Sequence, residues 1–193
     1  MKEKKYRIVL GSQSARRQQL LKGLDIDFEI KTLDNAEETF PADMPAGEVA
    51  PYLAGCKAEA LQPLADDELL ITADTVVVVD GKIYGKPSDK EEARSMLQTL
   101  SGRMHEVITG VAVTSAERSV LFAVSTKVWF THISMEDIDY YIERYRPFDK
   151  AGSYGIQEWI GFVGIERIEG SFYNVMGLPI HRIYRVLKDF GAI

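Results

Sequence analysis

One carboxylate stands in the middle of an apolar stretch, where its type and setting suggest chemistry. Asp74 lies in the segment Thr72-Ala73-Asp74-Thr75, inside the hydrophobic run 69–79. Burying a carboxylate is costly unless it is paired or binds a metal. Asp74 is therefore a candidate for holding Mg²⁺ or for deprotonating a water molecule. The alternative is a structural carboxylate, hydrogen-bonded at a strand end or bulge, and the rarity of buried ionisable groups favours function.

A second segment combines small residues with two adjacent arginines. Residues 11–17 read Gly-Ser-Gln-Ser-Ala-Arg-Arg and follow a β-branched apolar run. Small side chains let an anion approach the backbone N–H groups at a helix N-terminus, where the dipole also favours negative charge. Arg16 and Arg17 would add bidentate phosphate contacts. On local evidence alone, a plain surface turn with solvated arginines is an equal alternative.

Two loops complete the candidate chemistry. Gly85-Lys86-Pro87 places a lysine on a short rigid turn, although the tripeptide alone reads better as an exposed loop lysine. Residues 149–157 carry glycines and mixed polar groups that suit a loop close to a ligand, with a structural turn as the alternative. The sequence has no P-loop motif and no Gly-x-Gly-x-x-Gly, which argues against those nucleotide-binding classes.

The composition of the chain narrows the classes of ligand and partner that it could bind. The chain has 193 residues and a net charge of −6, which argues against general nucleic-acid binding and requires a local basic cluster for any polyphosphate ligand. Its single cysteine, Cys56, cannot form an internal disulfide, which fits a reducing compartment. The apolar run at 8–10 is too short for a signal peptide or membrane span. We expect one domain over residues 1–193, soluble and cytoplasmic, without a membrane partner.

The elements that must position these residues alternate between strand and helix patterns. Strands are expected at 6–11, 69–72, 76–79, 83–84, 107–113, 120–130 and within 162–168, with the sixth pairing antiparallel to the fifth and Asp80-Gly81 as a hairpin turn. Helices are expected after Ser14, over 48–61, after a Ser88–Glu91 capping box, after Ser134 and over 179–191. Pro51 fits its helix only in the first turn. Such alternation predicts an α/β fold with a mixed sheet.

Taken in order, these segments resemble the Maf-like nucleotide pyrophosphatase family. The matching pieces are Ser12-Gln13-Ser14-Ala15-Arg16-Arg17, Ala73-Asp74-Thr75-Val76-Val77, Gly85-Lys86-Pro87, Leu100-Ser101-Gly102-Arg103-Met104-His105, residues 149–157 and Asn174-Val175-Met176-Gly177-Leu178-Pro179. Each piece is weak alone, but the ordered set is specific and runs from about residue 8 to residue 187.

The resemblance implies an elongated mixed β-sheet of the Maf/inosine-triphosphatase type, flanked by helices, with two lobes around a central cleft. It implies hydrolysis of a nucleoside triphosphate between its α- and β-phosphates, with a divalent cation (Mg²⁺, Mn²⁺ or Co²⁺) and a homodimeric protein. The Ala-Asp-Thr-Val segment and residues 149–157 are similar to the branch acting on dTTP and UTP. The alternatives are a non-catalytic nucleotide-binding regulator of septum formation and a pyrophosphatase that prefers purines or 7-methyl-GTP.

The resemblance also assigns residues. Asp74 matches the family's catalytic acidic residue, as base or metal ligand, and Glu38 or its neighbour Glu37 matches a second acidic position. The substrate-binding positions are Ser12, Ser14, Arg16, Arg17, Lys57, Thr75, Lys86, Lys150 and Gln157. Two departures are visible: Ala15 replaces a usual proline, and Glu158 follows Gln157 where a glycine is common. The second departure, Glu158, concerns which nucleotides the protein prefers as substrates.

Overall fold

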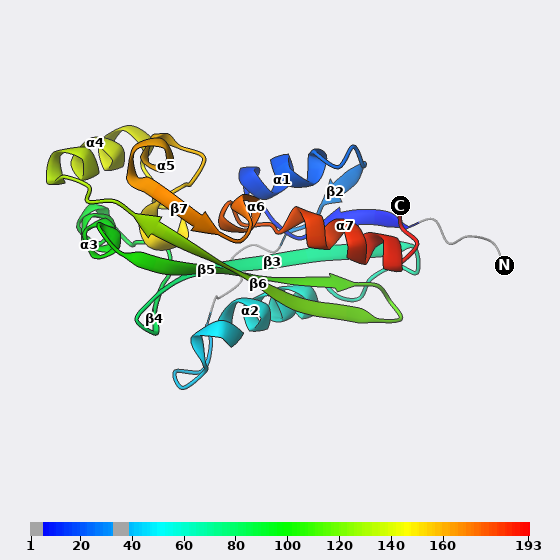
Figure 1. Ribbon diagram of the computed structural model, residues 1–193. Helices are drawn as coiled ribbons and strands as arrows, with labels where there is room; N and C mark the ends of the chain where they lie inside the picture. Colours follow the sequence, from blue (N-terminus) through cyan, green and yellow to red (C-terminus); the bar gives the residue numbers. More distant parts are fainter. Residues whose placement is uncertain (1–5, 33–38) are drawn as a thin grey trace. The chain divides into compact units, whose positions relative to one another are not determined.

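The computed structural model describes residues 6–32 and 39–193, and their strands form one mixed sheet flanked by helices (Figure 1). The strand order is β2-β1-β3-β5-β6-β7, with β4 paired to β3. The strands are β1 (Arg7–Leu10), β2 (Phe28–Ile30), β3 (Glu68–Val79), β4 (Lys82–Tyr84), β5 (Met104–Thr114), β6 (Ser119–Phe130) and β7 (Ile165–Glu169). The helices are α1 (Ala15–Lys22), α2 (Ala46–Ala60), α3 (Lys90–Leu100), α4 (Met135–Tyr145), η1 (Ala151–Ser153), α5 (Trp159–Gly164), α6 (Phe172–Val175) and α7 (Ile180–Asp189).

Strand directions confirm the predicted mixed sheet. The first strand, β1, is parallel to both β2 and β3, whereas β3–β4 and β6–β7 are antiparallel pairs. A hydrogen bond from Ser115 N to Arg118 O (2.9 Å) closes the short connection between β5 and β6, and Phe130 N donates to Arg103 O at their other end. These neighbours therefore form the expected antiparallel hairpin.

The chain divides into two compact units. The first contains the described residues up to Asp74, residues Thr109–Val124 and Gly177–Ile193, and the second contains Thr75–Ile108 and Ser125–Met176. The long strands β3, β5 and β6 contribute residues to both units. Asp74 is thus the last residue of the first unit on β3, and Thr75 is the first residue of the second.

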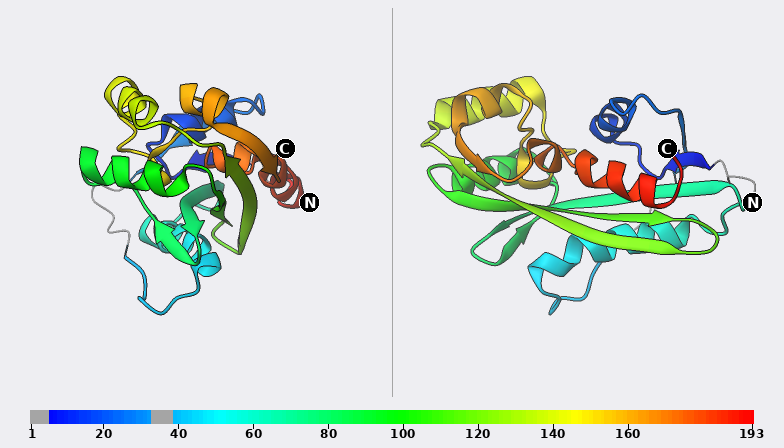
Figure 2. Two further views of the ribbon diagram at one scale, coloured as in Figure 1. Left: turned by 60° about the vertical axis from the view of Figure 1, so that its left-hand side comes forward. Right: turned by 45° about the vertical axis from the view of Figure 1, so that its right-hand side comes forward.

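In the first unit, α2 covers one face of the sheet, while α1 and α7 lie on the other (Figures 1 and 2). The α2 face is built on a cluster of buried side chains from β1, β3, β5 and the end of α2. Its members are Val9, Ala58, Leu61, Leu70 and Ala112. Alanine and glycine at this contact let the helix backbone approach the strands closely.

Gly110 on β5 sets the distance between α2 and the sheet. A Cβ atom at Gly110 would lie 2.1 Å from Pro51 N and 2.2 Å from the Ala50 carbonyl carbon. Any larger residue would push the helix off the strand. Pro51 lies in the second turn of α2, which begins at Ala46, so the expectation of a first-turn proline was wrong.

In the second unit, helices α3 and α4 are fixed by side-chain caps. Asp89 accepts a hydrogen bond from Glu92 N (2.8 Å), and Ser134 accepts one from Asp137 N (3.1 Å). The predicted Ser134 cap is confirmed. The predicted Ser88–Glu91 box is wrong by one residue, because Asp89 is the N-cap and Glu92 reaches back to Ser88 N (2.7 Å).

Three further expectations change in the structure. The runs 69–72 and 76–79 belong to a single strand, β3, which passes through Asp74 without interruption. The first three residues of the expected strand region at 162–168 are helical, because α5 extends to Gly164 before β7 begins. The short elements β2 and α6 were not predicted. The Asp80-Gly81 hairpin turn is confirmed, with both residues at positive φ.

No helix in the described parts of the chain, 6–32 and 39–193, is long and apolar enough to cross a membrane.

Candidate active site

The parallel pairing of β1 with β3 brings the 11–14 turn to the part of β3 that leads into Asp74. Leu10 is in register with Ile71, and Gly11 N donates to Ile71 O (2.8 Å). A Cβ atom at Gly11 would lie 2.7 Å from the Thr72 methyl group, so the turn needs a glycine. The strand β3 then continues beyond the end of β1 to Asp74.

Alternate residues of β3 point at α2, and this alternation decides where the Asp74 carboxylate goes. Leu70 packs in the cluster beneath α2, and Thr72 Oγ1 donates a 2.7 Å hydrogen bond to Ala54 O of that helix. Asp74, two residues further, accepts a 2.5 Å hydrogen bond from Lys57 Nζ at Oδ1. Ala54 and Lys57 are three residues apart, so they share one face of the helix.

Lys57 and Asp74 form a largely buried ion pair. The Asp74 side chain is 9% exposed and that of Lys57 is 17% exposed. The pairing supplies the compensation that an isolated carboxylate in this apolar strand would lack. The structure thus confirms that Asp74 is buried in the apolar run and adds the partner that the run itself could not identify.

The N-terminus of α1 carries Ser12, Ser14, Arg16 and Arg17. Ser14 is the N-cap, as expected from the sequence, but its side chain makes no capping hydrogen bond. Instead, Ser14 N donates to Ser12 Oγ (3.2 Å), and Ser12 is buried. No acidic residue stands in the first turn. The uncapped helix start and its two arginines match the chemistry of an anion-binding turn.

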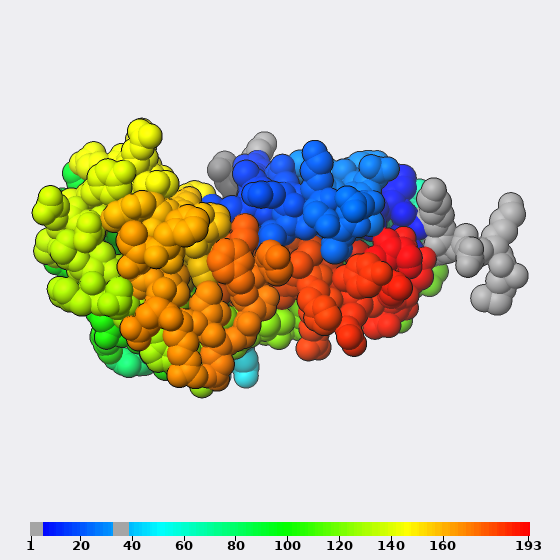
Figure 3. Space-filling model, turned by 45° about the horizontal axis from the view of Figure 1, so that its top comes forward, coloured from blue at the N-terminus to red at the C-terminus, as the bar shows by residue number. Residues whose placement is uncertain are grey.

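Arg17 is held by a residue from the far end of the sequence. Its Nε donates a 2.8 Å hydrogen bond to Gly177 O, just before α7. Gly177 has φ 110, a conformation that glycine adopts without strain. The space-filling view shows α1 and the segment leading into α7 side by side (Figure 3). The sequence pattern did not reveal this contact, although Gly177 lies in a segment that carried the family resemblance.

In the second unit, the Gly85-Lys86-Pro87 turn and the 149–157 loop are in direct contact. Gly152 N donates to Gly85 O (3.0 Å), and a Cβ atom at Gly152 would lie 2.8 Å from a Val77 methyl group. Gly152 also has φ 66, so both its space and its backbone conformation require glycine. The structure therefore brings together two of the loops that the sequence marked separately.

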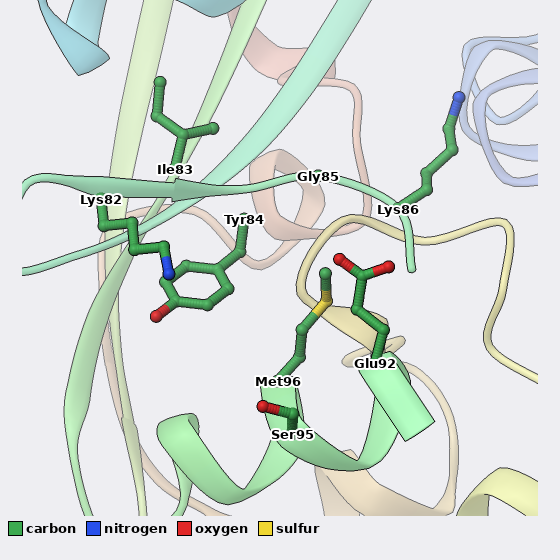
Figure 4. A pocket seen from close by; sticks show the side chains of 8 residues that line it. All are labelled: Lys82, Ile83, Tyr84, Gly85, Lys86, Glu92, Ser95 and Met96. Carbon is green, nitrogen blue, oxygen red and sulfur yellow. The ribbon is translucent and has the colours of Figure 1, made fainter. Parts of the chain in front are cut away.

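Lys86 itself is exposed and is one of the residues that line a hollow of about 200 Å³ (Figure 4). Tyr84, Glu92 and Met96 line the hollow, and the Lys86 side chain extends away from them (Figure 4). Its ammonium group is thus directed away from the hollow. Thr75, the first residue of this unit on β3, is half-buried.

Lys150 and Gln157 lie in the same loop but differ in their partners. The Lys150 ammonium group is buried and donates to Asp149 Oδ1 (2.8 Å), with Glu158 Oε1 at 3.1 Å. The Gln157 amide oxygen is buried and accepts no hydrogen bond from the described residues. Leaving such an acceptor unsatisfied costs about 1–3 kcal/mol, and a ligand donor would remove that cost.

A buried histidine lies near this loop. His105 Nε2 is 2.7 Å from Tyr154 Oη, and the His105 ring packs edge-on against Phe130 and Tyr154. Burial lowers the pKa of His105 from its ordinary value to about 4. The imidazole is therefore neutral at physiological pH and packs in the core. A structural role was expected, because the histidines of this chain do not have the spacing of zinc ligands.

The residues present fit one particular kind of metal site. Among the described residues, no group of three His, Cys, Asp or Glu side chains could hold a metal ion. Asp74 supplies one carboxylate, and Glu38 and Glu37 lie outside the described residues. Mg²⁺ is commonly bound through one or two carboxylates together with substrate phosphates and water. The single described carboxylate therefore suits a metal ion that is also bound by the phosphates of a polyphosphate ligand.

Comparison with known proteins places the chain in a family. The family model described as "Maf-like protein" matches residues 7–190. A protein of Porphyromonas gingivalis named "dTTP/UTP pyrophosphatase" is 60% identical, over 97% of this chain and 96% of that protein. A Parabacteroides distasonis protein of the same name is 52% identical over 97% of both chains. Among solved structures, a HAM1 protein from Coxiella burnetii is loosely similar, with a TM-score of 0.48 and 16% identity over 95% of this chain and 99% of that chain. The sequence match over almost the whole length shows that this chain belongs to the Maf-like protein family.

Proposed function

We propose that this protein is a nucleoside triphosphate pyrophosphatase that hydrolyses dTTP and UTP to the monophosphate and pyrophosphate. The observation that carries the proposal is the 60% identity, over nearly the full length of both chains, to a relative named for that activity. The buried Lys57–Asp74 pair supports it, because a carboxylate next to a basic group suits hydrolysis of an anionic substrate.

In this proposal, residues of the first unit bind the phosphate groups of the substrate. Arg16 and Arg17 neutralise phosphate oxygens, and Gly177 O orients the Arg17 guanidinium through its Nε–H. Ser12 and Ser14 keep the turn small, so that backbone N–H groups can face an anion. Each contact is worth most where negative charge grows as pyrophosphate leaves.

Asp74 activates the attacking water in this proposal. A water molecule must approach the α-phosphorus opposite the leaving pyrophosphate, and the Asp74 carboxylate accepts its proton or holds it in line. Lys57 stabilises the ionised carboxylate and fixes its direction, because Nζ lies 2.5 Å from Oδ1. Asp74, with Glu38 as a second acidic residue, would also hold a divalent cation, Mg²⁺, Mn²⁺ or Co²⁺. Such a cation supplies charge neutralisation and orientation of the phosphates when bound.

The test is a substrate panel with purified protein. Pyrophosphate release is measured from dTTP, UTP, CTP, GTP, ITP and 7-methyl-GTP with Mg²⁺, Mn²⁺ or Co²⁺, and again after chelation. We expect dTTP and UTP to be hydrolysed best and chelation to stop the reaction. Preference for a purine or for 7-methyl-GTP would overturn the substrate assignment. Tight dTTP binding without pyrophosphate release would favour the non-catalytic regulator instead.

We further propose that the protein acts in the cytoplasm as a homodimer. The single cysteine in 193 residues is compatible with a reducing compartment, and the family resemblance implies the dimer. Light scattering coupled to size exclusion tests the second part. A mass near twice 21.7 kDa supports it, and a mass near 21.7 kDa contradicts it.

A further inference from the structure

The strand β7, at one edge of the sheet, has exposed apolar side chains before and after it. Phe162 and Val163 on α5 lead into the strand, and Phe172 and Tyr173 on α6 follow it. All four side chains are exposed, and Phe162 is 82% exposed. Figure 3 shows the segment from α5 to α6 on the surface. Large apolar side chains gathered on one surface segment mark a site that another molecule covers.

The backbone of β7 can accept a further strand. Among the described residues, the strand order ends at β7, which pairs with β6 on one side. In an antiparallel pair, alternate residues of an edge strand turn their N–H and C=O groups away from the neighbouring strand. No residue from 165 to 171 is buried. The outer edge of β7 therefore offers hydrogen-bonding groups to an added strand.

The charges on β7 decide which register a second copy of the strand could take. Two antiparallel copies are related by a two-fold axis, and opposite residues point to the same face of the sheet, so one residue must face its own copy. An axis at Glu166, Arg167 or Glu169 sets like charges against each other, which is destabilising. Among the positions on β7, only an axis at Ile168 pairs opposite charges, because each Arg167 then faces the partner's Glu169.

The Arg167 side chain is already oriented for such a pairing. Its guanidinium carbon lies 4.5 Å from the centre of the Trp129 ring, and Nη2 donates a 2.9 Å hydrogen bond to Glu169 Oε2. Trp129 is opposite Arg167 on β6, so all three side chains share one face of the sheet. A side chain that is held before binding loses less conformational freedom when a partner arrives.

The same axis brings the exposed apolar side chains of two copies together. With Ile168 facing its own copy, each residue before it lies level with the partner residue equally far after it. Val163 on α5 then lies level with the partner's Tyr173 on α6. Since an aromatic side chain covers about 150–250 Å², the four exposed side chains offer roughly 400 Å² per copy. A stable interface buries about 800 Å² per partner, so the paired strands must supply the rest.

We propose that a second copy of this chain pairs its β7 antiparallel with this β7, about a two-fold axis at Ile168. The inference rests on the proposed homodimer and gives it an interface, but it does not depend on the proposed hydrolysis. In the dimer the two sheets join edge to edge, Arg167 binds the partner's Glu169, and α5 of each copy covers α6 of the other.

The test exchanges the charges of β7 and measures the mass of the particle by light scattering. Arg167→Glu sets glutamate against glutamate across the interface, and Glu169→Arg sets arginine against arginine. Each variant alone should raise the Kd of the dimer by about a hundredfold or more, because like charges in contact are strongly unfavourable. An equal mixture of the two variants should form a heterodimer, since every contact across the axis again joins opposite charges. A purely structural effect of either substitution would not be rescued by mixing.

A second pair of variants tests the apolar part of the interface. Phe162→Glu should weaken the dimer by at least about tenfold, whereas Leu121→Glu, at an exposed leucine on β6 in the first unit, is the matched control and should leave the Kd unchanged. Circular dichroism shows that each variant is folded.

Three results would overturn the inference: a monomeric native protein, single charge variants that dimerise as well as the native protein, or a mixture that stays monomeric. The first would also refute the proposed homodimer, whereas the second would leave a dimer with a different interface. The mass measurement needs no turnover. A native protein that dimerises in this way but releases no pyrophosphate would support the interface and refute the proposed hydrolysis.

Discussion

Removing the Lys57 ammonium group should destabilise the protein through the carboxylate it leaves behind. In Lys57→Met the aliphatic stem is retained, but Asp74 loses a partner at 2.5 Å while its side chain is only 9% exposed. Breaking a fully buried ion pair costs about 3–5 kcal/mol. Because the Lys57 side chain is 17% exposed, we expect the lower end, about 3 kcal/mol. For a chain of this size that corresponds to a fall in Tm of roughly 6–12 °C.

A double-mutant cycle separates this effect from simple loss of packing. Asp74→Asn removes the unpaired charge, so Lys57→Met with Asp74→Asn should recover at least about 1.5 kcal/mol of the single-variant loss. Urea denaturation followed by circular dichroism measures stability, and pyrophosphate release measures activity. Stability should recover in the double variant while activity stays lost. Lys22→Met, an exposed lysine on α1, is the control and should change stability by less than about 1 kcal/mol. A Lys57→Met protein within about 0.5 kcal/mol of native, or strictly additive losses, would refute the reasoning.

Two predictions concern the framework. Gly110→Ala should cost more than about 3 kcal/mol or prevent folding, because its Cβ would lie 2.1 Å from Pro51 N, whereas Gly47→Ala on the open side of α2 should be tolerated. Soluble yield and thermal unfolding compare the two, and equal stability would contradict the close packing of α2 on β5. Burial lowers the pKa of His105 to about 4 from an ordinary 6.5, so the unfolded chain takes up this proton first as the pH falls. The neutral, buried imidazole therefore contributes its full stability above about pH 6.5, and this contribution is lost as the pH falls towards about 4. The loss amounts to roughly 3 kcal/mol in the free energy of unfolding. His105→Gln should abolish that part of the pH dependence of urea unfolding. Identical pH profiles for native protein and variant would exclude this linkage.

From the residue pattern, the burial of Asp74 could be predicted, but its ion pair with Lys57 could not. An ionisable residue in an apolar run is a local signal, and the two apolar runs on either side of it were recognised as strands, although not as one continuous strand. Lys57 entered only through the family resemblance, because its contact with Asp74 depends on how closely α2 approaches the sheet. That approach is set by Gly110, more than fifty residues further along the chain. Neither the helix pattern of α2 nor the strand pattern of β3 contains this information.

Errors at element ends have a similar origin. Ser88 with Glu91 and Asp89 with Glu92 both satisfy the capping-box spacing, and the two alternatives differ by a single residue. The structure selects Asp89 and uses Ser88 as a second partner for Glu92. The last three residues of α5, 162–164, were expected to belong to a strand, because this helix is mostly apolar and too short to show helical periodicity.

The contact between Arg17 and Gly177 joins residues 160 positions apart, so no local pattern could predict it. Likewise, the sequence marked Lys150 as a substrate-binding candidate through family resemblance, whereas the structure shows its ammonium group held by Asp149 and Glu158. The role of Lys150 towards substrate remains a prediction. These cases share a cause: the chemistry of a side chain is readable in the sequence, but its partner is chosen by the fold.

Hydrolysis by Asp74→Asn tests the central claim most directly, because asparagine keeps the shape of the side chain and removes its ability to accept a proton. The variant should fold, as judged by circular dichroism, and bind dTTP, yet release pyrophosphate at least about a hundredfold more slowly than the native protein. Turnover close to that of the native protein would contradict the assignment of Asp74 as the group that activates water.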